Sequence, residues 1–304
     1  MITIIAFVGS VFSPYYRRAR NKQTQIAAPE NHCSINVALY AKAKNRWCMT
    51  ERYREDIKRD QNNFIIGPST LRFAPGDQHC SKLSIEINEK SAPLPRRVIG
   101  RVEIDLNIQQ DNHFALDRSN RHHWWPVSPG SRISVDLKHP AQRWKGHAYV
   151  DMNWGSAAIE DDIDYWCWSR YRLPTETLIF YDVYGRDCRP PEPPDQQIAV
   201  SITDSGKLKP VAEAELFGLA NTGWRMPRHA RSHHSQPVIV KTLEDTPFYS
   251  RSVITAHLNG KQTNGIHESV SLRRFKRPIV QAMLHFRMPR IRWTGGKQIL
   301  TPHK

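Results

Sequence analysis

Residues 121–155 hold many side chains that could transfer protons or face a positive charge. They are His122, His123, Trp124 and Trp125 at the start of the stretch, and His147, Tyr149, Asp151 and Trp154 towards its end. Imidazole, phenol and carboxyl groups can act as general acids or bases, and indole rings can stabilise a nearby cation. These residue types predict acid–base chemistry if the fold brings them together.

The histidines and Asp151 could also be read as zinc ligands. Structural zinc sites use closely paired Cys or His, and catalytic zinc sites use three ligands with one open position. Adjacent strand residues point to opposite faces, so at most one of His122 and His123 can join a given site. The spacing matches no standard zinc motif, and we therefore expect no metal here.

Strand alternation sorts these residues into pairs. It places His122 and Trp124 on one face of their strand, and Tyr149 and Asp151 on one face of another. If Asp151 faces a barrel interior, burial should keep its carboxyl neutral, and such an acid can protonate a very weak base. The alternative is that Asp151 ends its strand in solvent and caps the following turn. Alternation alone does not decide between these two interpretations.

The elements that position these residues are predicted to be β-strands. The chain has 21 prolines, many β-branched residues and frequent turn signals, which predict an all-β protein. The strands expected before residue 155 are 4–12, 34–40, 46–50, 63–66, 82–87, 98–106, 132–137 and 146–150. About eight strands would suit one closed antiparallel barrel.

The strand pattern restarts after an acidic break at residues 160–164. Further strands are expected at 165–169, 177–183, 197–203, 238–243, 249–258 and 280–286, with a turn at Asn259-Gly260. We therefore predict two domains and a tail. Residues 1–160 form a first barrel that carries the site, residues 161–290 form a second barrel, and residues 291–304 form a basic tail.

Charge and cysteine content limit the partners and the compartment. Residues 223–304 contain 15 Lys and Arg against 3 Asp and Glu, which favours an anionic partner such as nucleic acid or lipid headgroups. Five cysteines, an odd number with no C-x-x-C pair, indicate a reducing compartment. The apolar start lacks the basic region and cleavage site of a signal peptide. No segment reaches transmembrane length, so any membrane contact would be peripheral.

Ordered sequence blocks along nearly the whole chain resemble a known family, the bacterial carotenoid 1,2-hydratases, also called hydroxyneurosporene synthases. The blocks span residues 7–16, 30–33, 36–40, 49–52, 114–117, 122–126, 166–170, 243–251 and 286–290. The family's site has a His-x-Trp pair and a Tyr-x-Asp pair, which match His122 with Trp124 and Tyr149 with Asp151. Distant superfamily members read Asp-His-Glu-Trp-Gly where this chain has residues 151–155, Asp-Met-Asn-Trp-Gly.

This resemblance implies two tandem lipocalin-like barrels and a cofactor-independent lyase. Such enzymes add water across the terminal C1=C2 double bond of acyclic carotenes, for example neurosporene or lycopene. Asp151 would protonate the alkene, with Trp124 and Tyr149 stabilising the carbocation. His122 would either orient Asp151 or deprotonate the attacking water. Support or substrate-binding roles would fall to Trp125, Trp154 and His147.

The implied substrate lies in a membrane, so we expect a cytoplasmic protein that associates peripherally with the anionic surface of the inner or photosynthetic membrane. Two other functions remain open from the residues alone. A lipocalin-type carrier would bind an isoprenoid without chemistry and would need no acid. A nucleic-acid-binding protein is suggested by charge only, and since no nucleic-acid-binding module is recognisable we expect no such partner.

Overall fold

The computed structural model describes residues 1–22, 27–41, 45–76, 81–106, 111–186, 188, 190, 192–295 and 297–300. The chain forms two compact units. Unit 1 comprises Met1–Asn107, Arg132–Ala148 and Gln281–Lys304, and unit 2 comprises Ile108–Ser131 and Tyr149–Val280. Each unit combines separate chain segments, so neither follows the predicted division at residue 160. The proposal of two separately closed barrels remains a prediction.

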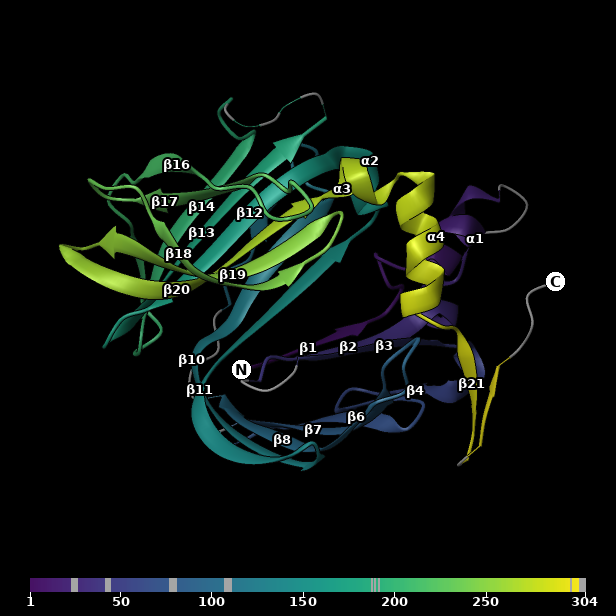
Figure 1. Ribbon diagram of the computed structural model, residues 1–304. Helices are drawn as coiled ribbons and strands as arrows, with labels where there is room; N and C mark the ends of the chain where they lie inside the picture. The colour runs from purple at the N-terminus through teal and green to yellow at the C-terminus, as the bar shows by residue number, and fades with distance from the viewer. Residues whose placement is uncertain are drawn as a thin grey trace. The chain divides into compact units, whose positions relative to one another are not determined.

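Unit 1 is built on antiparallel strands (Figure 1). Its three-stranded sheet consists of β1 (Ile2–Phe7), β2 (Cys33–Leu39) and β3 (Arg46–Arg52). A second sheet contains β4 (Ile57–Arg59), β5 (Asn63–Ile66), β6 (Ser69–Ala74), β7 (Ser81–Lys90) and β8 (Arg97–Leu106). It continues from β8 into the long strands β10 (His122–His139) and β11 (Ala141–Gly155). These two strands contribute residues to both units.

Unit 2 is built around a seven-stranded antiparallel sheet in the order β15-β14-β13-β12-β20-β19-β18. Its strands are β12 (Ile163–Arg172), β13 (Glu176–Gly185), β14 (Gln196–Thr203), β15 (Leu208–Pro210), β18 (Val238–Asp245), β19 (Tyr249–Leu258) and β20 (Lys261–Ser271). A separate pair joins β16 (Glu215–Leu219) to β17 (Arg228–Ser232), and β9 (Phe114–Ala115) pairs with β10.

The central strand β12 has two differently used faces. Tyr165 and Tyr171 point to one face and pack into hydrophobic clusters. These clusters contain Cys167, Leu178, Phe180, Tyr184, Ala214, Met226, Ala230, Ile254, Ala256 and Leu258. Alternation sends Trp166, Trp168 and Arg170 to the opposite face. This second face carries two buried tryptophans and the charged Arg170.

The helices are short. They are α1 (Pro14–Asn21), α2 (Ile159–Asp162), α3 (Leu272–Phe275) and α4 (Pro278–Arg287), with 3-10 turns at Pro29–His32 and Arg54–Asp56. The predicted strand at 280–286 is wrong, because this segment forms α4 (Figure 1). Pro278 suits the first turn of a helix, and Ala, Met, Leu and Gln in the segment favour helix.

The all-β class is confirmed, and most predicted strands lie where expected. The turn at Asn259-Gly260 is confirmed by positive φ values of 48° and 76° between β19 and β20. Within the predicted tail, β21 (Ile291–Thr294) and β22 (Lys297–Leu300) pair as a hairpin, while 296 and 301–304 lie outside the described residues.

The cysteines within the described residues, Cys33, Cys48, Cys167 and Cys188, are all free thiols. Cys80 lies outside the described residues. In the described part of the chain, no helix combines the length and apolar character needed to cross a bilayer.

Candidate active site

Asp151 is the acceptor of two hydrogen bonds from aromatic residues in unit 2. The indole Nε1 of Trp124 on β10 donates to Asp151 Oδ2 at 3.1 Å, and the hydroxyl of Tyr149 on β11 donates to the same oxygen at 3.2 Å. β10 and β11 are neighbouring strands, and alternation on β11 places Tyr149 and Asp151 on one face. The structure therefore brings together three of the four residues predicted to be catalytic.

Both donors converge on one carboxyl oxygen, which has a chemical consequence. Among the described residues, no hydrogen bond reaches the other oxygen, Oδ1. A neutral carboxylic acid has one acceptor oxygen and one hydroxyl oxygen that donates its proton. The arrangement suits an acid whose Oδ2 accepts from Trp124 and Tyr149 while Oδ1 carries a transferable proton.

The surroundings of Asp151 favour its protonated form. The pKa of Asp151 is raised to about 6; loss of solvation is the largest cause, and the charge of Glu268 acts in the same direction. The hydrogen bonds from Trp124 and Tyr149 oppose this shift. Asp151 itself is an exposed residue. Contact with solvent and desolvation can coexist, because desolvation depends on all the protein near the charge and not only on the residue's own surface.

Tyr149 is held as a hydrogen-bond donor and is covered by side chains from β12. Burial and the nearby charge of Asp151 raise the pKa of Tyr149 well above 10, so its hydroxyl keeps its proton. The Arg170 guanidinium lies 5.1 Å from the centre of the Tyr149 ring, and the Trp168 ring centre lies 5.4 Å from it. Arg170 therefore occupies one ring face of Tyr149.

Trp124 is completely buried, with an exposed fraction of 0%. Its ring packs 5.5 Å from Phe114 and meets Tyr181 edge-on at 5.7 Å between ring centres. An indole with no exposed surface cannot contact a bound molecule directly. In this structure Trp124 acts on the site through its N–H bond to Asp151.

A second carboxylate lies near Asp151 on the sheet of unit 2. Glu268 on β20 is directly opposite Trp168 on β12, and Trp168 is directly opposite Tyr181 on β13. Glu268 also faces Arg251 on β19 and accepts a hydrogen bond from Arg251 Nη2 at 2.5 Å. The buried guanidinium of Arg251 holds Glu268 in one position, and its carboxylate contributes to the raised pKa of Asp151.

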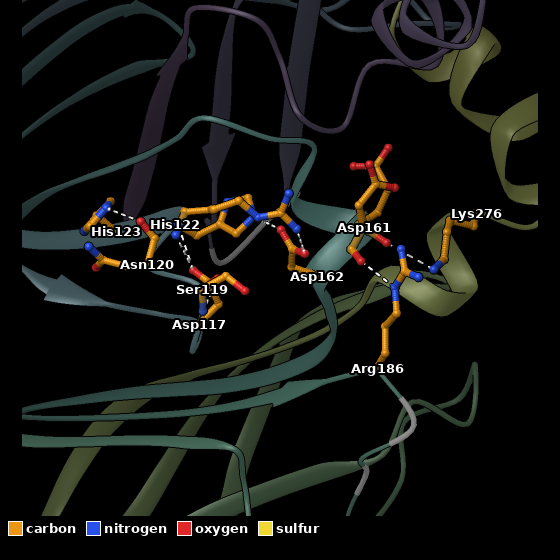
Figure 2. A network of polar contacts seen from close by, with 11 residues as sticks. Asp117, Ser119, Asn120, His122, His123, Asp161, Asp162, Arg186 and Lys276 are labelled. Carbon is orange, nitrogen blue, oxygen red and sulfur yellow. Dashed lines mark hydrogen bonds and ion pairs between the residues drawn. The ribbon is translucent and has the colours of Figure 1, made fainter.

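His122 has a different partner from the one expected. Its ring Nε2 lies 2.8 Å from Asp162 Oδ2, and its backbone N–H donates to Asp117 Oδ1 at 2.8 Å (Figure 2). Arg121 also pairs with Asp162. Within the described residues, no hydrogen bond joins His122 to Asp151. His122 therefore ties the start of β10 to α2, which closely follows the end of β11.

The residues expected to support the site or to bind substrate lie in both units. His123 stacks on Trp154 with ring centres 5.1 Å apart and an interplanar angle of 14°, and His113 lies against both rings. Trp125 is half-buried and, by alternation, points to the face of β10 opposite Trp124. His147 is exposed and belongs to unit 1, whereas Asp151 belongs to unit 2.

The sequence interpretation missed Trp168, Arg170, Tyr181, Arg251 and Glu268. Alternation along residues 165–170 could have shown that Trp168 and Arg170 share a face. It could not have shown that this face meets Tyr149, because the sequence of one strand does not determine which residues of a distant strand lie beside it. The charge pair of Arg251 and Glu268 also depends on cross-strand register.

Comparison with known proteins shows the family to which this chain belongs. The family model described as carotenoid hydratase CrtC matches residues 4–295. The chain belongs to the carotenoid hydratase family. This confirms the resemblance that the sequence motifs indicated.

Individual hydratases of the family are similar along most of the chain. The acyclic carotenoid 1,2-hydratase of Thiocapsa roseopersicina is 42% identical over 292 residues, which covers 95% of this chain and 69% of that protein. The enzyme of the same name from Cereibacter sphaeroides is 34% identical over 289 residues, which covers 94% of this chain and 98% of that protein.

The fold is similar to the crystal structure of an AttH protein from Nitrosomonas europaea. The TM-score is 0.53 at 11% sequence identity, covering 78% of this chain and 81% of that chain. At this identity the likeness supports the fold and says nothing of the chemistry.

Proposed function

We propose that this protein is an acyclic carotenoid 1,2-hydratase in which Asp151 protonates the terminal double bond. The observation that carries this proposal is the pair of hydrogen bonds from Trp124 and Tyr149 to one oxygen of Asp151. An isolated alkene is a very weak base, so it needs a neutral carboxylic acid as its proton donor. The raised pKa of Asp151 supports this assignment.

The reaction requires two bond-forming steps. The proton on Asp151 Oδ1 is transferred to C2 as the π bond breaks, which leaves a tertiary carbocation at C1 and a carboxylate at Asp151. The oxygen of a water molecule then bonds to C1. The surplus proton of that water returns to Asp151, directly or through solvent, so that one water is consumed and the acid is restored.

Aromatic rings near the acid can stabilise the cation without trapping it covalently. Tyr149 is half-buried and contacts Asp151 directly, whereas Trp124 is fully buried, so we assign the direct contact to Tyr149. A cation over such a ring gains about 0.5–2 kcal/mol. Trp168, whose ring centre lies 5.4 Å from that of Tyr149, adds a second aromatic ring beside the acid.

His122 is best assigned as a positioning residue. Its bond to Asp162 links β10 to the segment that follows β11, and these two strands carry Trp124 and Asp151. Through this link His122 would set the distance between the indole donor and the acid. This role does not require His122 to touch the substrate.

The reaction rate should depend on the protonation of Asp151. With a pKa of about 6, the acid form predominates below pH 6 and falls tenfold per pH unit above it. We expect kcat/KM to be constant at low pH and to fall above about pH 6. Bound carotenoid would exclude water and raise the pKa further, so kcat should fall at a higher pH than kcat/KM.

A variant of the neighbouring carboxylate provides the control for this pH dependence. The charge of Glu268 raises the pKa of Asp151, so Glu268→Gln should lower that pKa and move the fall in kcat/KM to lower pH. A profile that stays unchanged in Glu268→Gln, or that rises through pH 6 in the wild-type protein, would contradict Asp151 as the acid.

The activity itself can be tested with purified protein and lycopene dispersed in detergent micelles. We expect a product heavier than lycopene by one water, measured by liquid chromatography and mass spectrometry. A carrier, the second candidate function, would shift the absorption spectrum of lycopene without changing its mass. The match to the hydratase family favours the enzyme over the carrier.

A further inference from the structure

Helix α4 has apolar residues on the side that faces away from the protein. Ile279, Met283 and Phe286 are 67%, 36% and 73% exposed, and their spacing of four and three residues places them on one helix face together with the exposed Ala282. The opposite side of the helix is also apolar, with buried Val280 and Leu284. An exposed apolar helix face of this kind is normally covered by other protein or by lipid.

Basic residues lie at both ends of this apolar face. Residues 272–292 include seven Lys or Arg and no Asp or Glu. Several of the seven are used within the protein, such as Arg274, which donates to the carbonyl oxygen of Trp224. Arg273 and Arg277, before the helix, and Arg287, at its end, are exposed, and the Arg287 guanidinium also lies 4.9 Å from the centre of the Trp47 ring.

Helix α1 adds positive charge beside α4. The Tyr15 ring lies 4.8 Å from the His285 ring, which connects α1 to α4 within unit 1. A surface recess between the two helices is lined by Pro14, Arg17, Arg18, Asn21, Lys22, Gln281 and His285. Arg18 and Lys22 are exposed, and residues 14–22 contain no acidic side chain. Such a recess suits the phosphate group of a lipid.

We propose that the exposed face of α4 inserts into the surface of an anionic membrane, with Arg18, Lys22 and Arg287 on the lipid headgroups. An apolar helix face bordered by basic residues is the pattern of a helix that lies in a membrane interface. A second copy of the chain is a poorer occupant, because pairing two such faces would bring like charges together. The proposal gives the proposed hydratase a route to a substrate that is dissolved in lipid, and to that extent it depends on the proposed function.

Vesicle flotation tests this surface without relying on catalysis. Wild-type protein should float with vesicles of equal parts phosphatidylcholine and phosphatidylglycerol, and much less with pure phosphatidylcholine or at high salt. The double variant Ile279→Gln/Phe286→Gln should bind the anionic vesicles about tenfold more weakly or worse. Arg18→Gln/Lys22→Gln should lose most of the preference for anionic lipid.

The matched control is Val238→Gln/Val240→Gln on β18, where two valines are 63% and 57% exposed. This variant should bind like the wild-type protein. Equal loss in both apolar variants, or no loss in the α4 variant, would overturn the proposal. So would size-exclusion data in which the wild-type protein is a dimer and the α4 variant a monomer.

Hydration assays separate this inference from the proposed function. The α4 variant should hydrate lycopene in detergent micelles at the wild-type rate and lycopene in vesicles at least several times more slowly. Absence of product from the wild-type protein in micelles would refute the hydratase assignment and leave the flotation result standing. Equal rates of wild type and variant in vesicles would refute the docking surface alone.

Discussion

Replacing Asp151 by Asn should abolish hydration while the protein stays folded. The amide keeps an oxygen that can accept from Trp124 Nε1 and Tyr149 OH, but it has no proton acidic enough to transfer to an alkene. We expect the rate of lycopene hydration to fall by at least about a thousandfold, because the proton donor is lost and only binding and orientation remain. Product formation per hour, measured in micelles, gives the comparison.

The melting temperature separates this loss from unfolding. A carboxyl whose pKa is higher in the folded than in the unfolded state destabilises the fold once it ionises, so the effect is present above pH 6 and disappears below the unfolded value. At pH 8 the Asp151→Asn variant should therefore melt at the wild-type temperature or higher. Asp136→Asn, at a surface ion pair with Arg143, is the matched control and should keep full activity.

Replacing Trp124 should reduce activity in a manner that reveals how the indole acts. Trp124→Phe removes the N–H donor while keeping an aromatic ring in the buried site. Because that donor lowers the pKa of Asp151, the fall in kcat/KM should move to higher pH. At low pH, kcat/KM should still be about tenfold lower, since loss of a hydrogen bond to a charged or acidic group costs about 1.5 kcal/mol or more.

Trp124→Ala should lose nearly all activity and much stability. Removing a fully buried indole leaves a cavity and costs about 3–5 kcal/mol of the free energy of unfolding. Trp144→Phe, in the part of β11 that belongs to unit 1, is the control and should keep both the activity and the stability of the wild-type protein. If Trp124→Phe keeps the wild-type pH profile, then the indole does not act through its bond to Asp151.

The part of the site that lies on neighbouring strands was predictable from the sequence. Alternation paired Tyr149 with Asp151 on one face of β11, and both pack where Trp124 of β10 points. The same rule placed His122 beside Trp124, but not against Asp151. Its partner, Asp162, lies 40 residues later in α2, and local periodicity carries no information about such a contact.

The rest of the site depends on the sheet of unit 2. Trp168, Tyr181 and Glu268 become neighbours only through the registers of β12 with β13 and β20. Register is set by packing over the whole sheet, and a slip of one residue would reverse every face. The sequence of a single strand therefore predicts which side chains share a face. It does not predict which residues of other strands those side chains contact.

Two errors in the predicted elements have local causes. Residues 132–137 were expected to form a strand, yet β10 is longer, runs from His122 to His139 and includes Pro126 and Pro129. β9 pairs with it at His123 and Trp124, and β8 pairs from Arg132 onwards, so the prolines lie between the two pairings. Residues 280–286 read as an apolar strand, but an apolar run of this length is equally consistent with a helix.

Proton transfer from Asp151 to carbon can be measured directly in heavy water. Lycopene incubated with the wild-type protein in D₂O should give a hydrated product with one non-exchangeable deuterium at C2, located by mass spectrometry and NMR. Asp151→Asn, with a melting temperature at or above that of the wild-type protein, should form no such product above the background without protein. Deuterated product at the wild-type rate from Asp151→Asn would contradict the assignment of Asp151 as the proton donor.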